Sequence, residues 1–165
     1  MILNKVTESE LITLDLSTFL PNERPVLFDL KQFLFRELIL KEKDFRTALQ
    51  NHDWTIYSNQ TVLVFCSADA IIPVWAYMLV AVYLEPLTTR IYFDNPDSWK
   101  RKTLIQNIQQ LNITNYTDKR IVIKGCGDVT IDNAAYFEIT RRLLPVVKSI
   151  MYGEPCSTVP IYKRK

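Results

Sequence analysis

The sequence predicts an α/β fold with a mostly parallel sheet and helices on both faces, a three-layer, Rossmann-like topology without a nucleotide fingerprint. Two observations lead to this prediction. Short apolar, β-branched segments alternate with longer helical patterns along most of the chain, and the connections between them are short. Such alternation is typical of right-handed β-α-β units. The length of 165 residues suits one domain with a sizeable core, so we expect residues 1–165 to form a single α/β domain.

The amino-terminal part of the chain predicts two strands. Residues 11–19 alternate apolar and polar side chains, and residues 25–30 form a short apolar run after the break at Pro21. From residue 33 the periodicity is mixed. We expect a short extended or helical piece as far as residue 40, followed by a helix over residues 43–50.

The middle of the chain predicts a buried strand followed by a helix. Residues 61–65 are apolar on both faces, as in a strand that is covered on each side. A helix is expected over residues 70–84 if Pro73 lies in its first turn. The polar turn at residues 67–69 would cap the free N–H groups of this helix with its side chains.

The remaining elements continue the alternation. Residues 90–93 and 120–124 read as strands, and the amphipathic segment 97–111 reads as a helix between them. Residues 132–152 have a helical pattern that Pro145 would kink or split. Beyond them, the segment Ser157-Thr-Val-Pro-Ile161 suits an edge strand or a strap over a site, since it contains β-branched residues and a proline.

Composition and charge limit the class of function. The net charge is +2 and charged residues make up 23% of the chain, which gives no broad nucleic-acid footprint. The longest apolar stretch, residues 70–84, contains a proline and is shorter than a membrane span, and no signal-peptide pattern is visible. We therefore expect a cytoplasmic protein that binds neither nucleic acid nor membrane. The composition does not indicate an oligomeric state.

The three cysteines are the most suggestive residues for function. Cys66 and Cys126 each follow a predicted strand, and Cys156 lies in a turn after the last helical pattern. All three glycines lie within three residues of Cys126 or Cys156. An odd number of widely spaced cysteines in a chain of this size argues against a secreted disulfide framework. If the strands before Cys66 and Cys126 are neighbours, the two sulfurs would be roughly 5 to 10 Å apart.

A thiol at the position of Cys66 would have useful chemistry. The positive end of the following helix lowers the pKa of a nearby thiol and favours the thiolate, which is both a nucleophile and a metal ligand. The carboxylate of Asp69 would raise that pKa unless it points away. With Cys66, Cys126 and Cys156 as metal ligands, Asp69, His52 or water could take a fourth position.

Three sulfur ligands would select zinc, an iron–sulfur cluster or copper(I) over magnesium or calcium. None of the cysteines belongs to a Cys-x-x-Cys pair, so the fold would have to bring them together. The alternative is a purely structural role, in which each cysteine is a small buried hydrophobic residue.

Other catalytic signals are weak. His52 is the only histidine, and it more simply caps a helix end or lies at the surface. Three glycines are too few for a dinucleotide fingerprint or a P-loop. The polar residues Asp128, Asp132 and Asn133 are explained by helix capping, and the tryptophans and tyrosines by core packing.

Several segments resemble an uncharacterised family of small bacterial cytoplasmic proteins, the domain of unknown function 2480. The segments are CSADAIIPVWAYML from Cys66, VIKGC from Val122 and SIMYGEPCSTVPIYK from Ser149, with further likeness in ITLDL and LILKEKDFR. The resemblance covers almost the whole chain. It implies no activity, and the partners that it implies are iron–sulfur cluster assembly proteins.

Three functions remain open from the sequence. The first is a metal or iron–sulfur related binding protein with Cys66, Cys126 and Cys156 as ligands and Asp69 nearby. The second is an enzyme, a thiol-dependent sulfur transferase or redox protein in which Cys66 is the nucleophile and another cysteine resolves the intermediate. The third is an interaction module without catalysis, whose carboxyl-terminal segment docks on a partner or on a second copy.

Overall fold

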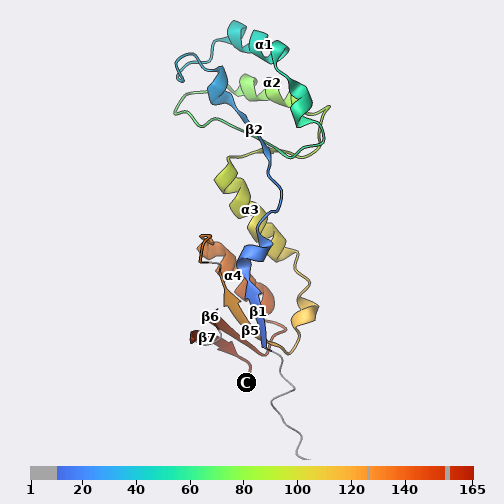
Figure 1. Ribbon diagram of the computed structural model, residues 1–165, viewed down its shortest axis with the longest axis vertical. Coiled ribbons are helices and arrows are strands. Elements are labelled where there is room, and N and C mark those ends of the chain that lie inside the picture. The colour runs from blue at the N-terminus through green and yellow to red at the C-terminus, as the bar shows by residue number, and fades with distance from the viewer. Residues whose placement is uncertain (1–10, 126, 155–156) are drawn as a thin grey trace, which may run out of the picture. The chain divides into compact units, whose positions relative to one another are not determined.

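The computed structural model describes residues 11–125, 127–154 and 157–165. It divides into two compact units. Unit 1 comprises Met1–Pro21 and Lys100–Lys165, and unit 2 comprises Asn22–Trp99. Unit 2 is therefore inserted into the sequence of unit 1. Each unit has its own sheet and its own buried hydrophobic cluster, and Figure 1 labels most of the elements.

Unit 1 contains a four-stranded sheet in the order β1-β5-β6-β7. The first three strands are parallel and β7 pairs antiparallel with β6. The strands are β1 (Leu11–Asp15), β5 (Arg120–Lys124), β6 (Ser149–Glu154) and β7 (Ser157–Lys163). The helices are α3 (Pro96–Gln109), which begins before the unit boundary, and α4 (Asn133–Leu143), with short 3-10 helices η1 (Leu16–Phe19) and η4 (Ile113–Tyr116).

Unit 2 contains a three-stranded parallel sheet in the order β2-β3-β4. Its strands are β2 (Val26–Asp29), β3 (Val62–Phe65) and β4 (Ile91–Phe93). Its helices are α1 (Glu42–Asn51) and α2 (Val74–Leu84), with 3-10 helices η2 (Leu30–Phe33) and η3 (Trp54–Tyr57).

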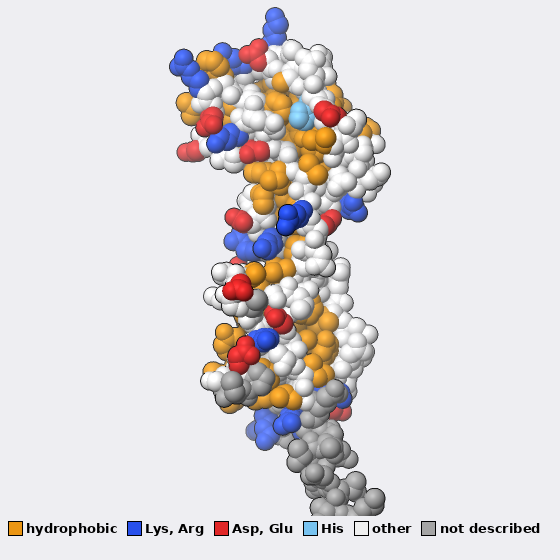
Figure 2. Space-filling model, viewed as in Figure 1, with side chains coloured by type: hydrophobic (Ala, Val, Ile, Leu, Met, Phe, Trp, Pro, Cys, Tyr) orange, Lys and Arg blue, Asp and Glu red, His pale blue; other side chains and the backbone are white. Residues whose placement is uncertain are grey.

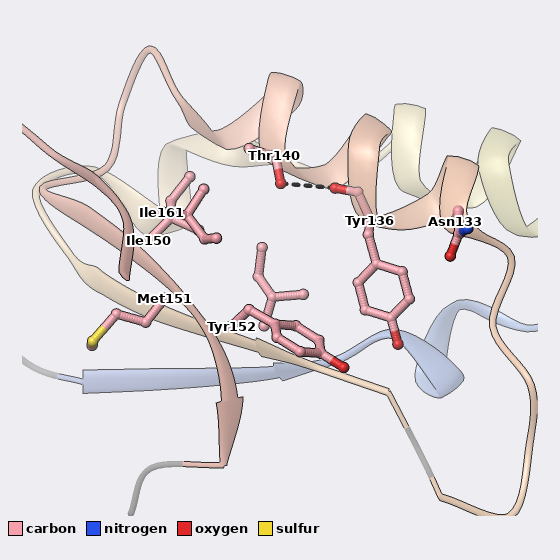
Figure 3. A pocket seen from close by; sticks show the side chains of 8 residues that line it. Asn133, Tyr136, Thr140, Ile150, Met151, Tyr152 and Ile161 are labelled. Atoms are coloured by element: carbon pink, nitrogen blue, oxygen red, sulfur yellow. Dashed lines mark hydrogen bonds between the residues drawn. The ribbon is translucent and has the colours of Figure 1, made fainter. Parts of the chain in front are cut away.

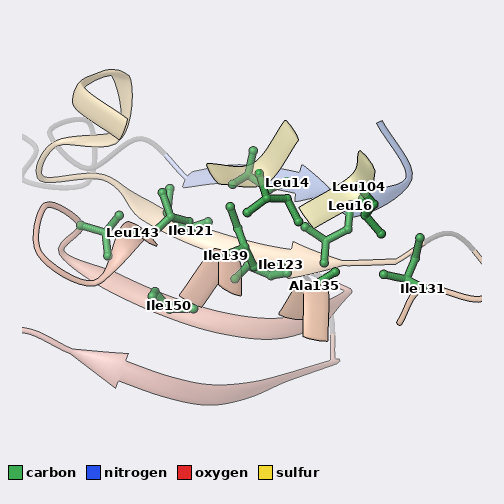
Figure 4. Packing of buried hydrophobic residues seen from close by; sticks show 12 residues of the cluster. Leu14, Leu16, Leu104, Ile121, Ile123, Ile131, Ala135, Ile139, Leu143 and Ile150 are labelled. Carbon is green, nitrogen blue, oxygen red and sulfur yellow. The ribbon is translucent and has the colours of Figure 1, made fainter. Parts of the chain in front are cut away.

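In each unit the helices pack on one face of the sheet. The cluster of unit 1 takes Ile121 and Ile123 from β5 together with residues of both α3 and α4, whereas Val122, which points to the opposite face, is not part of it. Figure 4 shows this packing. The cluster of unit 2 likewise takes Val62 and Val64 from β3 with residues of α1 and α2. On the other face of each sheet, Val122 and Leu63 of the central strands are also fully buried, although they belong to neither cluster.

The two units repeat the same succession of elements. Each begins with a strand and a 3-10 helix and continues with a helix, a 3-10 helix, a strand, a helix and a strand. From α1 onward the equivalent residues differ by a constant 59 positions: α2 spans Val74–Leu84 and α4 spans Asn133–Leu143, and η3 and η4 match in the same way. Unit 1 adds β7, for which unit 2 has no counterpart among its described elements.

Details of the backbone follow the same repeat. Asn59 and Asp118 are equivalent, and their φ angles are 56° and 59°. Their N–H groups donate to the carbonyls of Leu87 and Val146, which are also equivalent, over 3.0 and 2.8 Å. The buried positions correspond too, in pairs such as Val80 with Ile139. The two units therefore share one architecture, a feature that our reading of the sequence missed.

Most of the predicted elements are present. The strand at 120–124 has the predicted bounds, and the strands near 25–30, 61–65 and 90–93 and the helices near 43–50 and 97–111 are confirmed within a few residues. The predicted strand at 11–19 ends at Asp15 and continues as η1. The piece between residues 33 and 40 is an irregular turn closed by a bridge between Phe35 and Ile39. Residues 157–161 lie in an edge strand, as one of the two alternatives proposed.

Two predicted helices needed correction. The prediction of a helix over 132–152 was wrong beyond Leu143. Pro145 cannot continue the helix, and residues 149–154 pair with β5 as β6. The helix expected over 70–84 begins only at Val74, with Pro73 as its N-cap residue. Ser67 does not cap this helix, since its side chain bonds to Asp29 instead.

The fold class is confirmed as mixed α/β with mostly parallel strands, whereas a three-layer Rossmann-like sheet is not confirmed. The strands divide between two sheets because each unit pairs its own strands. A single domain over residues 1–165 stays a prediction. None of the helices in the described ranges is long and apolar enough to cross a membrane, and the cytoplasmic location stays a prediction.

Candidate functional site

A groove on the helix-covered face of unit 1 is the candidate site, because it combines apolar walls with polar side chains. It lies between α4 and the strands β5, β6 and β7, and its volume is about 400 Å³. Figure 3 shows the side chains around it. The lining residues are Ile123, Asn133, Tyr136, Thr140, Ile150, Met151, Tyr152 and Ile161. The groove exists because the sheet extends past α4 and no further described helix covers β6 and β7 on this side.

An irregularity in β7 contributes one wall of the groove. Ile150 pairs with Tyr162 and Met151 pairs with Pro160, so Ile161 is an extra residue on β7. A bulge of this kind bends a strand and redirects a side chain. Ile161, which is 52% exposed, lines the groove from this position.

Two tyrosines supply polar groups at the carboxyl end of the strands. The rings of Tyr136 and Tyr152 are 5.7 Å apart and nearly perpendicular. Burial raises the pKa of Tyr136, and the negative charges of Tyr152 and Asp15 raise it further. Tyr136 is therefore protonated at neutral pH and its O–H group is a hydrogen-bond donor. Ligands of parallel α/β sheets collect at this end of the strands.

Gly125 makes room for the hydroxyl of Tyr136. A Cβ atom on Gly125 would collide with Tyr136 Oη, whereas a Cβ on Gly127 would meet no atom within 4 Å. The glycine directly after β5 thus allows the tyrosine of α4 to approach the backbone. This is a steric reason for one of the glycines that the sequence places beside Cys126.

Charged side chains lie at the same carboxyl ends of the strands as the two tyrosines. Asp15 ends β1, and hydrogen bonds from Ser17 lower its pKa, as does the positive charge of Lys124 at the end of β5. Lys124 Nζ lies 3.8 Å from Glu154 Oε2 at the end of β6. Charges of alternating sign therefore cross the sheet edge next to the tyrosines.

Cys66 directly follows β3 at the carboxyl end of the sheet in unit 2, as predicted. Its thiol is partly buried, and Sγ donates to the carbonyl of Ala68 at 3.6 Å. Nearby, Asp29 at the end of β2 accepts hydrogen bonds from Ser67 Oγ at 2.5 Å and from Ser67 N at 3.0 Å. Burial would raise the pKa of Asp29, but these bonds and one from Lys31 N outweigh it and lower the pKa.

The convergence of the three cysteines stays a prediction. Cys126 and Cys156 lie outside the described residues. The strands before Cys66 and Cys126 are not neighbours, because β3 and β5 belong to different sheets, so the condition on which we expected those two sulfurs to approach is not met. Within the described ranges no group of three or more His, Cys, Asp or Glu side chains could hold a metal ion.

The other predicted site residues have ordinary surroundings. Asp69 is exposed in the loop after Cys66. His52 is the C-cap residue of α1, and its Nε2 lies 2.9 Å from the hydroxyl of Tyr57. Asp132 caps α4 by accepting a bond from Ala134 N at 2.8 Å, as expected. Positive and negative side chains are interspersed on the visible face in Figure 2, in keeping with the small net charge.

Our reading of the sequence missed the groove because its residues are those of any core. Tyr136 and Tyr152 were assigned to core packing and Asn133 to helix capping. One signal was available: comparison of the chain with itself at a shift of 59 residues aligns Tyr136 with Tyr77 and would have placed both at the same point of a repeated unit.

Comparison with known proteins identifies a family without supplying a function. Neither the curated proteins nor the solved structures contain a match to this chain. A family model does match, over residues 1–164. The chain belongs to the family described as "Protein of unknown function (DUF2480)".

Proposed function

We propose that this protein binds a small, largely apolar molecule that carries a neutral polar group, and that the groove of unit 1 holds it. The composition of the groove carries the proposal. Ile123, Ile150 and Ile161 form an apolar surface, and the hydroxyls of Tyr136 and Tyr152 lie at one end. A volume of about 400 Å³ falls within the range of small-molecule sites, which combine apolar walls with a few polar groups.

The charges and hydrogen-bond donors of the groove favour a ligand with a neutral hydrogen-bond acceptor. Tyr136 stays protonated at neutral pH, so it donates a hydrogen bond to an acceptor such as a carbonyl or hydroxyl oxygen. The carboxylate of Asp15 is close enough to raise the pKa of Tyr136 and would repel an anionic ligand. Neutral ketones or alcohols therefore fit better than carboxylates.

The test is a binding measurement by NMR with aryl ketones and with the matching aryl carboxylates. We expect the ketones to perturb the signals of Tyr136, Thr140 and Tyr152. Tyr136→Phe should weaken ketone binding by roughly two- to tenfold, the value of one neutral hydrogen bond. Tyr77→Phe changes the equivalent residue of unit 2 and should leave binding unchanged. Tighter binding of the carboxylates, equal effects of the two variants or no binding in the groove would contradict the proposal.

A second candidate is a metal or iron–sulfur centre held by thiolates. It is favoured by the order of the strands in unit 1. Cys126 comes two residues after Lys124 and Cys156 two residues after Glu154, and these two charged residues end the neighbouring strands β5 and β6. We propose Cys126 and Cys156 as ligands of zinc or an iron–sulfur cluster, with Cys66 and Asp69 as the further groups predicted from the sequence.

Metal analysis of protein purified without oxygen tests this candidate. A bound metal that is lost in the double variant Cys126→Ser with Cys156→Ser would support it, and Cys66→Ser would then show whether the third thiol contributes. Metal-free protein would reject it. If Cys66 is then alkylated rapidly and selectively, the thiol-dependent transferase or redox alternative is favoured instead. Iron–sulfur cluster assembly proteins as partners stay a prediction.

A further inference from the structure

Helix α2 exposes an apolar stripe that the rest of unit 2 does not cover. Val74, Met78 and Val82 follow one another at intervals of four residues and are 76%, 66% and 68% exposed. Residues at this spacing lie above one another on one side of a helix. Ile71, just before the helix, is 94% exposed. No charged residue occurs between Val74 and Leu84, so no charge interrupts the stripe.

Strand β4 continues this surface. Phe93 is 70% exposed, and its ring contacts that of Tyr77 from α2 at 4.8 Å. β4 is an edge strand of its sheet. In unit 1 the equivalent strand, β6, is followed in the sheet by β7. Unit 2 therefore leaves open, next to its apolar helix, the edge that unit 1 closes.

The internal repeat shows that this stripe is specific to unit 2. The residues of α4 that are equivalent to Val74, Met78 and Val82 are Asn133, Phe137 and Arg141. The two helices bury equivalent positions, since Ala76, Val80 and Leu84 correspond to Ala135, Ile139 and Leu143. The shared architecture thus does not require a continuous apolar stripe on the outer face of the helix, since Asn133 and Arg141 flank Phe137 on α4. The continuous stripe on α2 therefore indicates a binding surface.

We propose that this surface, formed by Ile71, Val74, Met78, Val82 and Phe93, binds the same surface of a second copy of the chain in a two-fold dimer. From their exposed fractions, these five residues expose an area on the order of 600 Å², at the top of the range for the largest apolar patch of a typical monomer. Two copies would together bury about 1,000 Å², the area that a specific interface needs. The patch has no charge, so two copies meet without repulsion, and a straight stripe is complementary to itself across a two-fold axis.

Met78 lies at the centre of the stripe. Its flexible thioether side chain can adapt to the facing helix, a role methionine often has at apolar interfaces. Introduction of a charge at this central position would place an unpaired carboxylate in the apolar interface, whereas 66% exposure in the single chain means that the folded chain tolerates the change.

Sedimentation of the full chain over a wide range of concentrations tests the proposal. We expect a reversible dimer for the wild type and a dissociation constant raised at least about tenfold in Met78→Glu. The matched control is Phe137→Glu, which puts the same charge at the equivalent, 70% exposed position of α4 and should leave the dimer unchanged. Circular dichroism checks that each variant folds.

A second variant tests the same surface in case Met78→Glu disturbs the local fold of α2. Val82→Arg introduces the residue that α4 has at the equivalent position, so the architecture accommodates it, and it should also weaken the dimer. A wild type that stays monomeric at all concentrations would reject the proposal, as would equal weakening by Phe137→Glu and Met78→Glu. Groove binding by aryl ketones does not depend on this surface, so either proposal can fail alone.

Discussion

The position of the Tyr136 ring in unit 1 depends on the absence of a side chain at Gly125. The backbone of Gly125 lies against the Tyr136 hydroxyl, and no side chain can be added there without moving the ring. Because this ring lines the groove, its position determines the shape of the site. Gly127, two residues along, has free space where a Cβ would lie and serves as an internal comparison.

Gly125→Ala should therefore destabilise the protein by about 1–3 kcal/mol, as overpacking does, and should weaken ketone binding in the groove. Urea unfolding and the NMR binding measurement check both effects. Gly127→Ala should change neither. Removal of the colliding oxygen in the double variant Gly125→Ala with Tyr136→Phe should recover much of the stability, and failure to recover it would show that the hydroxyl is not the obstacle.

His52 makes the stability of the protein depend on pH near neutrality. Burial lowers its pKa below the usual value near 6.5, and the negative charge of Asp53 opposes this only in part. Its ring also lies against those of Phe28 and Trp54 in the core of unit 2. The folded state thus binds a proton less readily than the unfolded state.

We expect the free energy of unfolding to decrease as the pH falls through the ordinary histidine pKa toward the lowered one. Urea unfolding at pH 7.5 and at pH 5.5 measures the change, and NMR follows the single histidine directly. His52→Gln should remove this dependence on pH. An unchanged slope in that variant would assign the effect to other groups.

At the scale of single residues, the sequence predicted roles that depend on neighbouring residues in the chain, but not contacts between distant residues. The position of Cys66 after a strand and the capping role of Asp132 were recognised, because both depend on neighbours in the chain. The contact between Gly125 and Tyr136 was not, since it joins a loop to a helix through the fold. Cys126 and Cys156, to which most of the functional argument was attached, lie outside the described residues.

At the scale of elements, Asp29 links β2 to the loop after β3. Its carboxylate receives two hydrogen bonds from Ser67, which is 38 positions away in the sequence. In unit 1 the equivalent carboxylate, Asp15, receives its bonds from Ser17 within the same turn. Both carboxylates also cap the 3-10 helix that follows their strand, through Ser17 N and Lys31 N. Asp29 therefore combines this local role with a tertiary bond to the loop after β3.

Ser67→Ala should destabilise the protein by about 1 kcal/mol and raise the pKa of Asp29 toward its ordinary value. A lowered pKa of Asp29 stabilises the folded state at pH values above the ordinary carboxyl pKa, and this stabilisation is lost as the pH falls. The variant, in which the pKa is less lowered, should therefore lose less stability on acidification. Urea unfolding at pH 7 and near pH 3.5 tests this. Ser17→Ala is the control, with a smaller expected loss because its bond closes only a local turn.

Elements were predictable where one periodicity held over their whole length. Residues 120–124 and the helix near 43–50 satisfied this condition. The segment 132–152 did not, because a helix and a strand follow each other across Pro145 and were read as one element. The pairing of the strands could not be predicted. The alternation of strands and helices indicates β-α-β units, but it does not show how many sheets the strands form.

At the scale of the whole molecule, the two separate clusters predict separate responses to core substitutions. All three tryptophans, Trp54, Trp75 and Trp99, lie in the sequence range of unit 2, so tryptophan fluorescence reports on that unit. Far-ultraviolet circular dichroism reports on both. Comparison of the two probes therefore tests whether residues 1–165 unfold as one domain.

Ile139→Ala in the core of unit 1 should cost about 2–5 kcal/mol and shift the transition seen by circular dichroism more than that seen by tryptophan fluorescence. Val80→Ala changes the equivalent position of unit 2 and should shift the fluorescence transition instead, by a smaller amount because valine is smaller. Identical shifts of both probes in both variants would mean that the chain unfolds in one cooperative step.

The insertion of unit 2 within unit 1 sets an order of events during synthesis. Asn22–Trp99 is continuous in sequence and can acquire its native contacts as soon as it has left the ribosome. β1 emerges first, yet its partner β5 is made about a hundred residues later. β1 therefore cannot pair with β5 until after the inserted unit has left the ribosome, and until then its backbone hydrogen-bonding groups are open to pairing with other strands.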